Sequence, residues 1–179
     1  MRSVFLYFAG DRLSTAELTA ACLDGHLVGL GEGFIPADTI ETASLRAASL
    51  AELLGTQLAA THESAAWVHG IADDPPARHR VQRTTPRRLH EPVGRRFVYR
   101  DPQIPDHDLV TIGGVRVTSA PRTIVDLARS ADGAPALLTR WAREDVDAVR
   151  AAGKWVQDSH RIPHRRVAIE RIDAALRTT

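Results

Sequence analysis

Apolar and polar positions in the first 56 residues follow the short periods of a small α/β unit. A continuous apolar run predicts a strand, and apolar residues that recur every three or four positions predict a helix. Gly31 and Glu32 separate two short apolar runs, which is typical of a hairpin. The predicted elements are a strand over 3–8, a helix over 16–23, a hairpin of 26–30 and 33–36, and a helix over 39–54.

The remaining residues alternate between helical and strand periods. Asp73, Asp74, Pro75 and Pro76 make a break after the first helix of this part, and four strand-like runs follow. The pattern then becomes helical up to the C-terminus. The predicted elements are a helix over 61–70, strands over 79–83, 96–100, 109–112 and 115–118, and helices over 120–131, 134–152 and 164–177.

These elements predict an α+β protein. A helix followed by a hairpin is the minimal back half of a winged helix-turn-helix, so residues 1–56 are expected to form a short, degenerate winged-helix-like module. Residues 57–179 are expected to form a mixed domain with a small, mostly antiparallel sheet flanked by helices. A chain of 179 residues has room for two such units.

Composition places the chain among ordinary soluble globular proteins. Apolar residues make up 44% and charged residues 25% of the sequence. Cys22 is the single cysteine, so an internal disulfide and a cysteine-based zinc site have no ligands. The sequence has no run of about 18 apolar residues, and Asp11 and Arg12 interrupt the apolar N-terminus. We therefore expect a cytoplasmic protein that does not contact a membrane.

Charge is distributed unevenly although the net charge is only +1. Residues 1–60 hold 3 Arg and 7 acidic residues, whereas residues 75–100 hold 8 Arg and Glu91 as the only acid. Basic residues are nearly all arginine, with Lys154 as the one lysine. A GC-rich genome explains this preference, and arginine is also the better bidentate ligand for phosphate.

Motifs for catalysis, metals and cofactors are missing from the sequence. His62-Glu63 lacks the second histidine of a zinc-protease motif, and Asp106-His107-Asp108 follows a proline, which predicts a solvated turn. Gly29, Gly31 and Gly33 fit turns better than a dinucleotide-binding loop. We therefore expect no catalytic residue, no metal, no cofactor and no small-molecule substrate, and keep an unrecognised hydrolase or nucleotidyltransferase site as a remote alternative.

The basic segment between residues 78 and 96 is the main candidate for nucleic-acid contact. In a strand over 78–83, alternate side chains share a face, and phosphate contacts use arginine and amide side chains. A solvated sheet face, or a surface that binds an acidic protein, explains the same residues. The candidate DNA-binding residues are Arg78, Arg80, Gln82, Arg83, Arg87, Arg88, Arg95 and Arg96.

Two separated motifs resemble a known family. They read Thr61-His-Glu-Ser-Ala-Ala-Trp-Val-His-Gly-Ile71 and Gly114-Val-Arg-Val-Thr-Ser-Ala-Pro-Arg-Thr-Ile-Val-Asp-Leu-Ala-Arg129. Together with the arginine-rich segment between them, they are similar to the AbiEi family antitoxins of type IV toxin–antitoxin systems in actinobacteria. Ala120 and Pro121 stand in the reverse of the family's usual order.

The resemblance implies a function in phage defence. It implies an N-terminal winged helix-turn-helix that binds operator DNA and a C-terminal domain that neutralises a toxin. The toxin would be a nucleotidyltransferase-like protein encoded by the adjacent gene, and the antitoxin would repress the shared promoter. Residues 13–45 contain no Arg, although phosphate neutralisation supplies much of DNA affinity. Either DNA contact has moved to the basic segment, or the N-terminal module serves protein–protein contact, and the chain could bind an acidic partner without contacting DNA.

The motif residues themselves are expected to be structural. Trp67 should be the largest buried anchor of its helix, which also carries His62 and Ser64. Arg122 and Asp126 are four residues apart on one helix and can form an ion pair at the junction between strand and helix.

Overall fold

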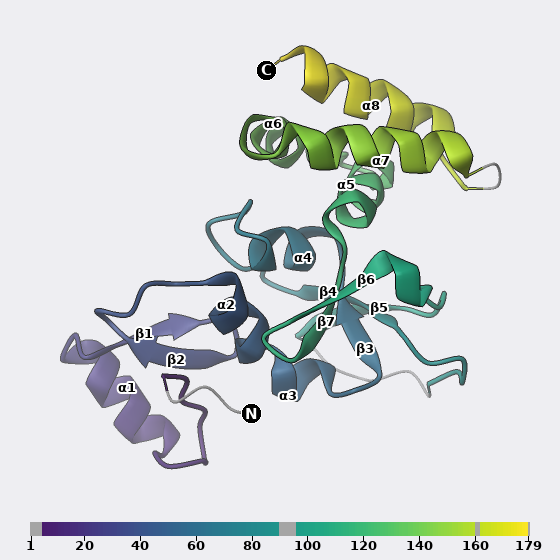
Figure 1. Ribbon diagram of the computed structural model, residues 1–179. Coiled ribbons are helices and arrows are strands. Elements are labelled where there is room, and N and C mark those ends of the chain that lie inside the picture. The colour runs from purple at the N-terminus through teal and green to yellow at the C-terminus, as the bar shows by residue number, and fades with distance from the viewer. Residues whose placement is uncertain (1–4, 90–95, 160–161, 179) are drawn as a thin grey trace.

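The computed structural model describes residues 5–89, 96–159 and 162–178. Helices and sheets of two and five strands together make an α+β fold, as predicted. Figure 1 shows a helical layer above the larger sheet and a separate small hairpin unit to one side of it.

The N-terminal module begins with α1 (Thr15–Leu23) and the hairpin of β1 (Leu27–Leu30) and β2 (Gly33–Pro36). The capping box between Ser14 and Glu17 explains where α1 starts. The hairpin turns at Gly31, whose φ is +54°. A side chain at this position would collide with Ser49, so only glycine fits here. The predicted strand over 3–8 is wrong within the described residues, because only Tyr7 makes a bridge there, to Phe34.

The helix predicted over 39–54 is shorter and divided. It consists of α2 (Ala43–Ser49) and α3 (Ala51–Leu54), separated at Leu50. The Thr42 hydroxyl accepts a hydrogen bond from the Leu45 amide, so α2 starts at Ala43 rather than at Thr39.

The larger sheet has the strand order β5-β4-β3-β7-β6. Its pairs β3–β4 and β6–β7 are antiparallel, whereas β3–β7 and β4–β5 are parallel, so this sheet is mixed rather than mostly antiparallel. The sequence pattern did not predict its central strand, β3. The strands are β3 (Leu58–Ala60), β4 (His79–Arg83), β5 (Phe97–Arg100), β6 (Leu109–Ile112) and β7 (Val115–Thr118).

Helix α4 (His62–Val68) follows the central strand directly, and α5 (Ala120–Arg129) follows β7. The helix predicted over 134–152 is wrong as a single element. It is broken at Asp145, whose side chain accepts from the Ala148 amide and starts a new helix. The resulting helices are α6 (Pro135–Glu144) and α7 (Val146–Asp158), and α8 (Arg165–Arg177) completes the layer.

Two groups of buried apolar residues hold these layers together. One lies among α5, α6, α7 and α8 and includes Trp141 and Ile172. The other contains Trp67 with Val81 and Val117 of the sheet, and also Ile35 and Leu50 of the N-terminal module. The module and the sheet therefore share a core across the predicted boundary at residues 56 and 57. None of the helices in the described ranges is long and apolar enough to cross a membrane.

Candidate functional site

The beginnings of β4 and β5 carry two exposed arginines of the basic segment. These strands are parallel, so their first residues lie side by side at the edge of the sheet. Arg78 donates to the carbonyl of Phe97 at 2.9 Å and has no acidic partner among the described residues. Arg96 forms an ion pair with Glu32, yet 71% of its side chain is exposed. Both guanidinium groups can reach a ligand outside the sheet.

Arg80, Gln82 and Arg83 are engaged within the protein. The Nε atom of Arg80 lies 2.8 Å from Glu63, and the Gln82 amide donates to the carbonyl of Pro102. Arg83 donates to the carbonyls of Thr85 and Pro86. The buried Gln82 side chain has no access to an external ligand.

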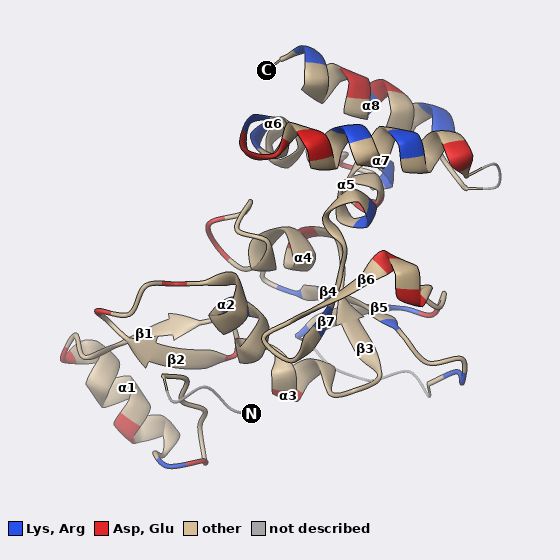
Figure 2. Cartoon of the chain, viewed as in Figure 1, with Lys and Arg blue, Asp and Glu red and all other residues tan. Residues whose placement is uncertain are grey.

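The turn after β4 carries the other exposed arginines of this set. Arg87 is exposed and has no hydrogen bond or ion pair within the described ranges. Arg88, with 84% of its side chain exposed, shares Asp101 with Arg83. Arg95 lies outside the described residues. Figure 2 shows basic residues along β4, β5 and this turn. Seven described arginines between 78 and 100 face three carboxylates, so the segment keeps a surplus of positive charge.

Arg122 and Asp126 form the ion pair that their spacing predicts, with 3.0 Å between Nε and Oδ2. Both side chains are largely buried. Sequence analysis missed a second carboxylate, Asp108, whose Oδ2 atom lies 2.5 Å from Nη1 of Arg122. Its Oδ1 atom accepts a hydrogen bond from Trp155 Nε1 at 2.9 Å. The solvated turn predicted at 106–108 is therefore wrong for Asp108, which is buried and joins the sheet to α5 and α7.

Burial and ion pairing act in opposite directions at this junction. Burial raises the pKa of Asp126, and the nearby Arg122 and Arg129 oppose that shift. Burial lowers the pKa of Arg122, but Asp126 and Asp108 outweigh it and the pKa is raised overall. Arg122 also lies over the ring of Trp155, 5.3 Å from its centroid. The arrangement fixes the junction between β7 and α5 and offers no group free to act as a nucleophile.

The motif residues of α4 are buried, and for Trp67 this confirms the prediction. Trp67 is fully buried, and Ser64 Oγ accepts from the Arg80 amide at 2.9 Å, which ties α4 to β4. Thr61 is the N-cap residue of α4 but makes no side-chain capping bond, and its hydroxyl lies 2.9 Å from His62 Nδ1. Burial lowers the pKa of His62 to about 3, so this imidazole is neutral at physiological pH.

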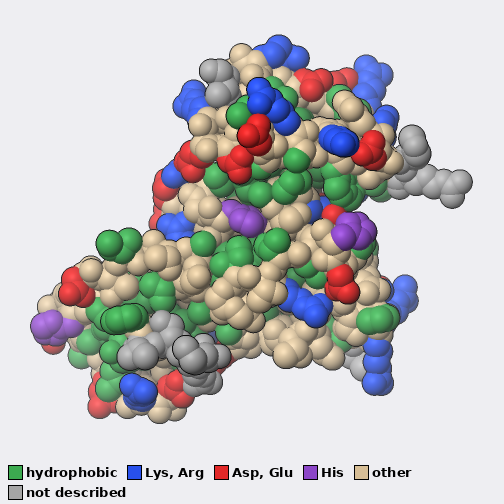
Figure 3. Space-filling model, in the orientation of Figure 1, with side chains coloured by type: hydrophobic (Ala, Val, Ile, Leu, Met, Phe, Trp, Pro, Cys, Tyr) green, Lys and Arg blue, Asp and Glu red, His purple; other side chains and the backbone are tan. Residues whose placement is uncertain are grey.

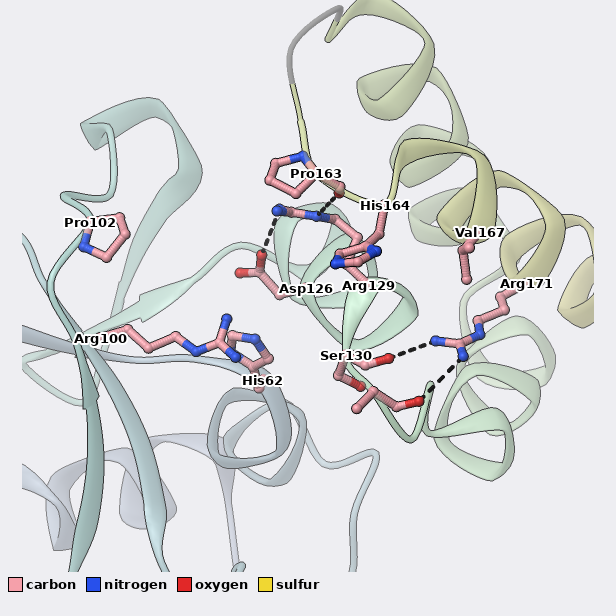
Figure 4. A pocket seen from close by; sticks show the side chains of 11 residues that line it. His62, Arg100, Pro102, Asp126, Arg129, Ser130, Pro163, His164, Val167 and Arg171 are labelled. Carbon is pink, nitrogen blue, oxygen red and sulfur yellow. Dashed lines mark hydrogen bonds and ion pairs between the residues drawn. The ribbon is translucent and has the colours of Figure 1, made fainter.

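A cavity of about 650 Å³ lies where β5, α4, α5 and the start of α8 meet (Figure 4). Three arginines that sequence analysis did not select line it: Arg100, Arg129 and Arg171. Each comes from a different element, so no local spacing could have brought them together. The cavity also contains His62 and Asp126 of the two motifs. The described residues include no group of three or more side chains suited to hold a metal ion.

Comparison with known proteins supports the resemblance. A search of curated proteins finds no match. The family model of the AbiEi antitoxin C-terminal domain matches residues 58–151, from β3 to within α7. The match covers more than half of the chain and contains the basic strands, the α4 motif and the Arg122 junction. The protein therefore belongs to the AbiEi family of antitoxins.

Proposed function

We propose that this chain acts by binding alone, as an antitoxin that neutralises its toxin and represses the promoter of its own operon. Family membership gives it an antitoxin role and a cognate toxin as its partner. The finer parts of the proposal are that the toxin is nucleotidyltransferase-like and that the antitoxin contacts operator DNA. Antitoxins of this family are generally not enzymes, and the proposal assigns no chemical step to any residue.

The observation that carries the proposed DNA contact is the surplus of arginine at the β5 edge of the sheet. Arg78, Arg87, Arg88 and Arg96 present exposed guanidinium groups there, and they have few carboxylates to neutralise them. Such groups bind phosphates with high affinity and little dependence on sequence. We assign phosphate contact to these four and a structural role to Arg80, Gln82 and Arg83.

The N-terminal module favours contact with protein rather than DNA. Leu23 and Ile40 are large apolar residues with more than four-fifths of their surface exposed, and Val28 is also exposed. In Figure 3 apolar side chains cover much of this module. Exposed apolar surface of this kind marks protein-binding sites. We assign this module to a protein partner and the β5 edge to DNA.

Promoter binding by a fourfold variant tests the DNA contact. Replacing Arg78, Arg87, Arg88 and Arg96 with Ala should weaken binding to the chain's own promoter duplex and to a scrambled duplex alike. The log–log slope of affinity against salt should fall by about one for each arginine that contacts a phosphate. Fluorescence anisotropy over a salt series measures both effects. The matched control replaces four exposed arginines of the helical layer with Ala: Arg143, Arg150, Arg166 and Arg177.

The two functions give separable results. The fourfold variant should still rescue growth when it is co-expressed with the toxin from the adjacent gene. Replacing Leu23 and Ile40 with Glu should abolish rescue and leave promoter binding intact, whereas Val110→Glu, also at an exposed apolar position, should have no effect. Wild-type promoter affinity in the fourfold variant would refute the DNA contact, and the alternative of a purely protein-binding module would then stand.

A further inference from the structure

The cavity shown in Figure 4 collects positive charge that the protein does not neutralise. Among the described residues its lining contains Arg100, Arg129 and Arg171 but only one carboxylate, that of Asp126. Asp126 neutralises two arginines at once. Its closer ion pair, at 3.0 Å, is with Arg122, which does not line the cavity, and Arg129 lies 3.6 Å away. The cavity therefore carries at least one uncompensated positive charge.

Two of these arginines are held in place by carbonyl groups. Arg129 donates through Nε to the carbonyl of Pro163 at 2.9 Å. Arg171 donates through Nη1 to the carbonyls of Ala128 and Ser130 at 2.9 and 2.7 Å. A carbonyl orients a guanidinium group without cancelling its charge, and an arginine has five N–H donors. Both residues therefore keep donors for a ligand and have side chains that are already positioned.

Arg100 is the third cation and the least engaged. Within the described parts of the chain, its side chain has no hydrogen bond or ion pair. Figure 4 shows its guanidinium group beside the His62 ring, where it extends toward the cavity. Burial lowers the pKa of Arg129, Asp126 opposes that shift, and the nearby Arg122 and Arg100 add to it.

Backbone conformation also distinguishes this cavity. Among the described non-glycine residues, only His62, Ala134 and His164 have a positive φ, and both histidines line the cavity. A positive φ is unfavourable for such residues and is often found at functional sites. The imidazole of His62 is buried at the wall beside Arg100.

We propose that this cavity binds the phosphate group of a nucleotide-sized ligand, through Arg100, Arg129 and Arg171. Guanidinium groups match phosphate oxygens with paired, charge-assisted hydrogen bonds. A volume of about 650 Å³ exceeds what one phosphate fills and lies within the usual range of small-molecule sites. Pro102, Pro163 and Val167 add apolar surface beside the charged groups, against which a sugar or base can pack. The site is separate from the proposed DNA contacts at Arg78, Arg87, Arg88 and Arg96.

Calorimetric titration tests the proposal on the full chain. The probes are inorganic pyrophosphate, adenosine diphosphate, adenosine, and a trinucleotide with either a 5′-phosphate or a 5′-hydroxyl. We expect saturable binding of the phosphate-bearing probes and none of adenosine. Stronger binding of adenosine diphosphate identifies a free nucleotide as the source of the phosphate, and stronger binding of the 5′-phosphorylated trinucleotide identifies a nucleic-acid end.

Charge-matched variants separate this site from general attraction to a basic protein. Arg100→Gln should weaken pyrophosphate binding about tenfold or more, since it removes a charge-assisted hydrogen bond. Arg143→Gln removes the same charge from an exposed position on α6, outside the cavity, and should leave affinity unchanged. The Arg100 side chain makes no hydrogen bond or ion pair within the described residues, so its variant should melt like the wild type. Arg129→Gln should also weaken pyrophosphate binding, as a second test of the site.

Two results would overturn the proposal. One is the absence of saturable binding by any phosphate-bearing probe. The other is equal affinity of the Arg100→Gln and Arg143→Gln proteins for pyrophosphate. Promoter binding measured on the same variants keeps the two proposals apart, because Arg100→Gln should retain the operator affinity that the fourfold variant loses.

Discussion

Asp108 is the residue whose removal should most clearly disturb the centre of the family domain. Its carboxylate is buried and joins two elements, with Arg122 Nη1 at 2.5 Å and Trp155 Nε1 at 2.9 Å. Asp108→Ala removes both acceptors and provides no substitute. Arg122 keeps Asp126 as a partner at 3.0 Å, so its charge is not left isolated.

The expected cost follows from these two bonds. A hydrogen bond to a charged group contributes about 1.5–3 kcal/mol, and an N–H group left buried without an acceptor costs about 1–3 kcal/mol. The substitution also removes the cost of burying the carboxylate, so the total should lie below the sum. We expect Asp108→Ala to lower the free energy of unfolding by about 3 kcal/mol. Asp108→Asn keeps an acceptor for Trp155 and should lose about half as much.

Urea denaturation followed by circular dichroism measures these differences, provided that the m-value is unchanged. A double-mutant cycle measures how much of the lost free energy of unfolding comes from the hydrogen bond to Trp155. In a Trp155→Phe background no indole N–H remains to be satisfied, so Asp108→Ala should cost at least about 1 kcal/mol less. An Asp108→Ala protein within about 0.5 kcal/mol of the wild type would show that these two bonds do not stabilise the junction, because surface substitutions have effects of that size.

Three further predictions concern residues of the two motifs. Trp67 is fully buried, so Trp67→Ala should cost about 3–5 kcal/mol in urea unfolding, and Trp67→Phe much less, since the buried indole Nε1 has no described partner; wild-type melting of Trp67→Ala would contradict its place in the core. Asp126→Ala should cost more than about 1.5 kcal/mol, and exchanging the charges of Arg122 and Asp126 should not recover it, because Asp108 and Arg129 would then each lie beside a like charge; a fully stable Asp126→Ala protein that fails to neutralise the toxin would place the pair on the functional surface. The folded pKa of His62, about 3, lies below its unfolded value, so the unfolded state binds more protons as pH falls below about 6.5 and stability decreases. Between pH 7.5 and 5.5 this histidine should account for about 1.4 kcal/mol of that loss, and His62→Asn should show a correspondingly flatter dependence of the urea midpoint on pH.

The parts of the fold that sequence analysis predicted well are those with local signals. The hairpins of β1–β2 and β6–β7 each turn at glycines, which separate two short strand-like runs in the sequence. Helix α5 begins where predicted because Ser119 accepts from the Arg122 amide and Pro121 lies in the first turn. These signals act over a few residues and therefore appear in the sequence.

The central strand and the break between α6 and α7 lack such signals. β3 is only three residues long, and two of them are alanines, which have low strand propensity. It is a strand because β4 and β7 pair with it on either side. The apolar period of 134–152 continues past Asp145, and only the capping bond to Ala148 shows that a new helix starts there.

The candidate sites also contain some features with a local sequence signal and others that only tertiary packing creates. The i, i+4 spacing predicted the pair of Arg122 and Asp126, but Asp108 reaches Arg122 from a turn 14 residues earlier. Residues 78–100 were recognised as basic from composition, yet composition could not separate the exposed Arg78 from the engaged Arg83. The cavity arginines belong to β5, α5 and α8, and only the tertiary packing of these three elements brings them together.

The shared core explains how one small antitoxin can present two different surfaces. Arg46 of α2 donates to the carbonyls of Trp67 and Ala72 at 2.9 Å, so the N-terminal module supplies the hydrogen bonds that end α4. Ile35 and Leu50 of the module belong to the same buried cluster as Trp67 and Val81 of β4. A partner that binds the exposed apolar residues of the module therefore contacts a body rigidly continuous with the β4–β5 edge. The two proposed surfaces therefore belong to one packed body rather than to two independent modules.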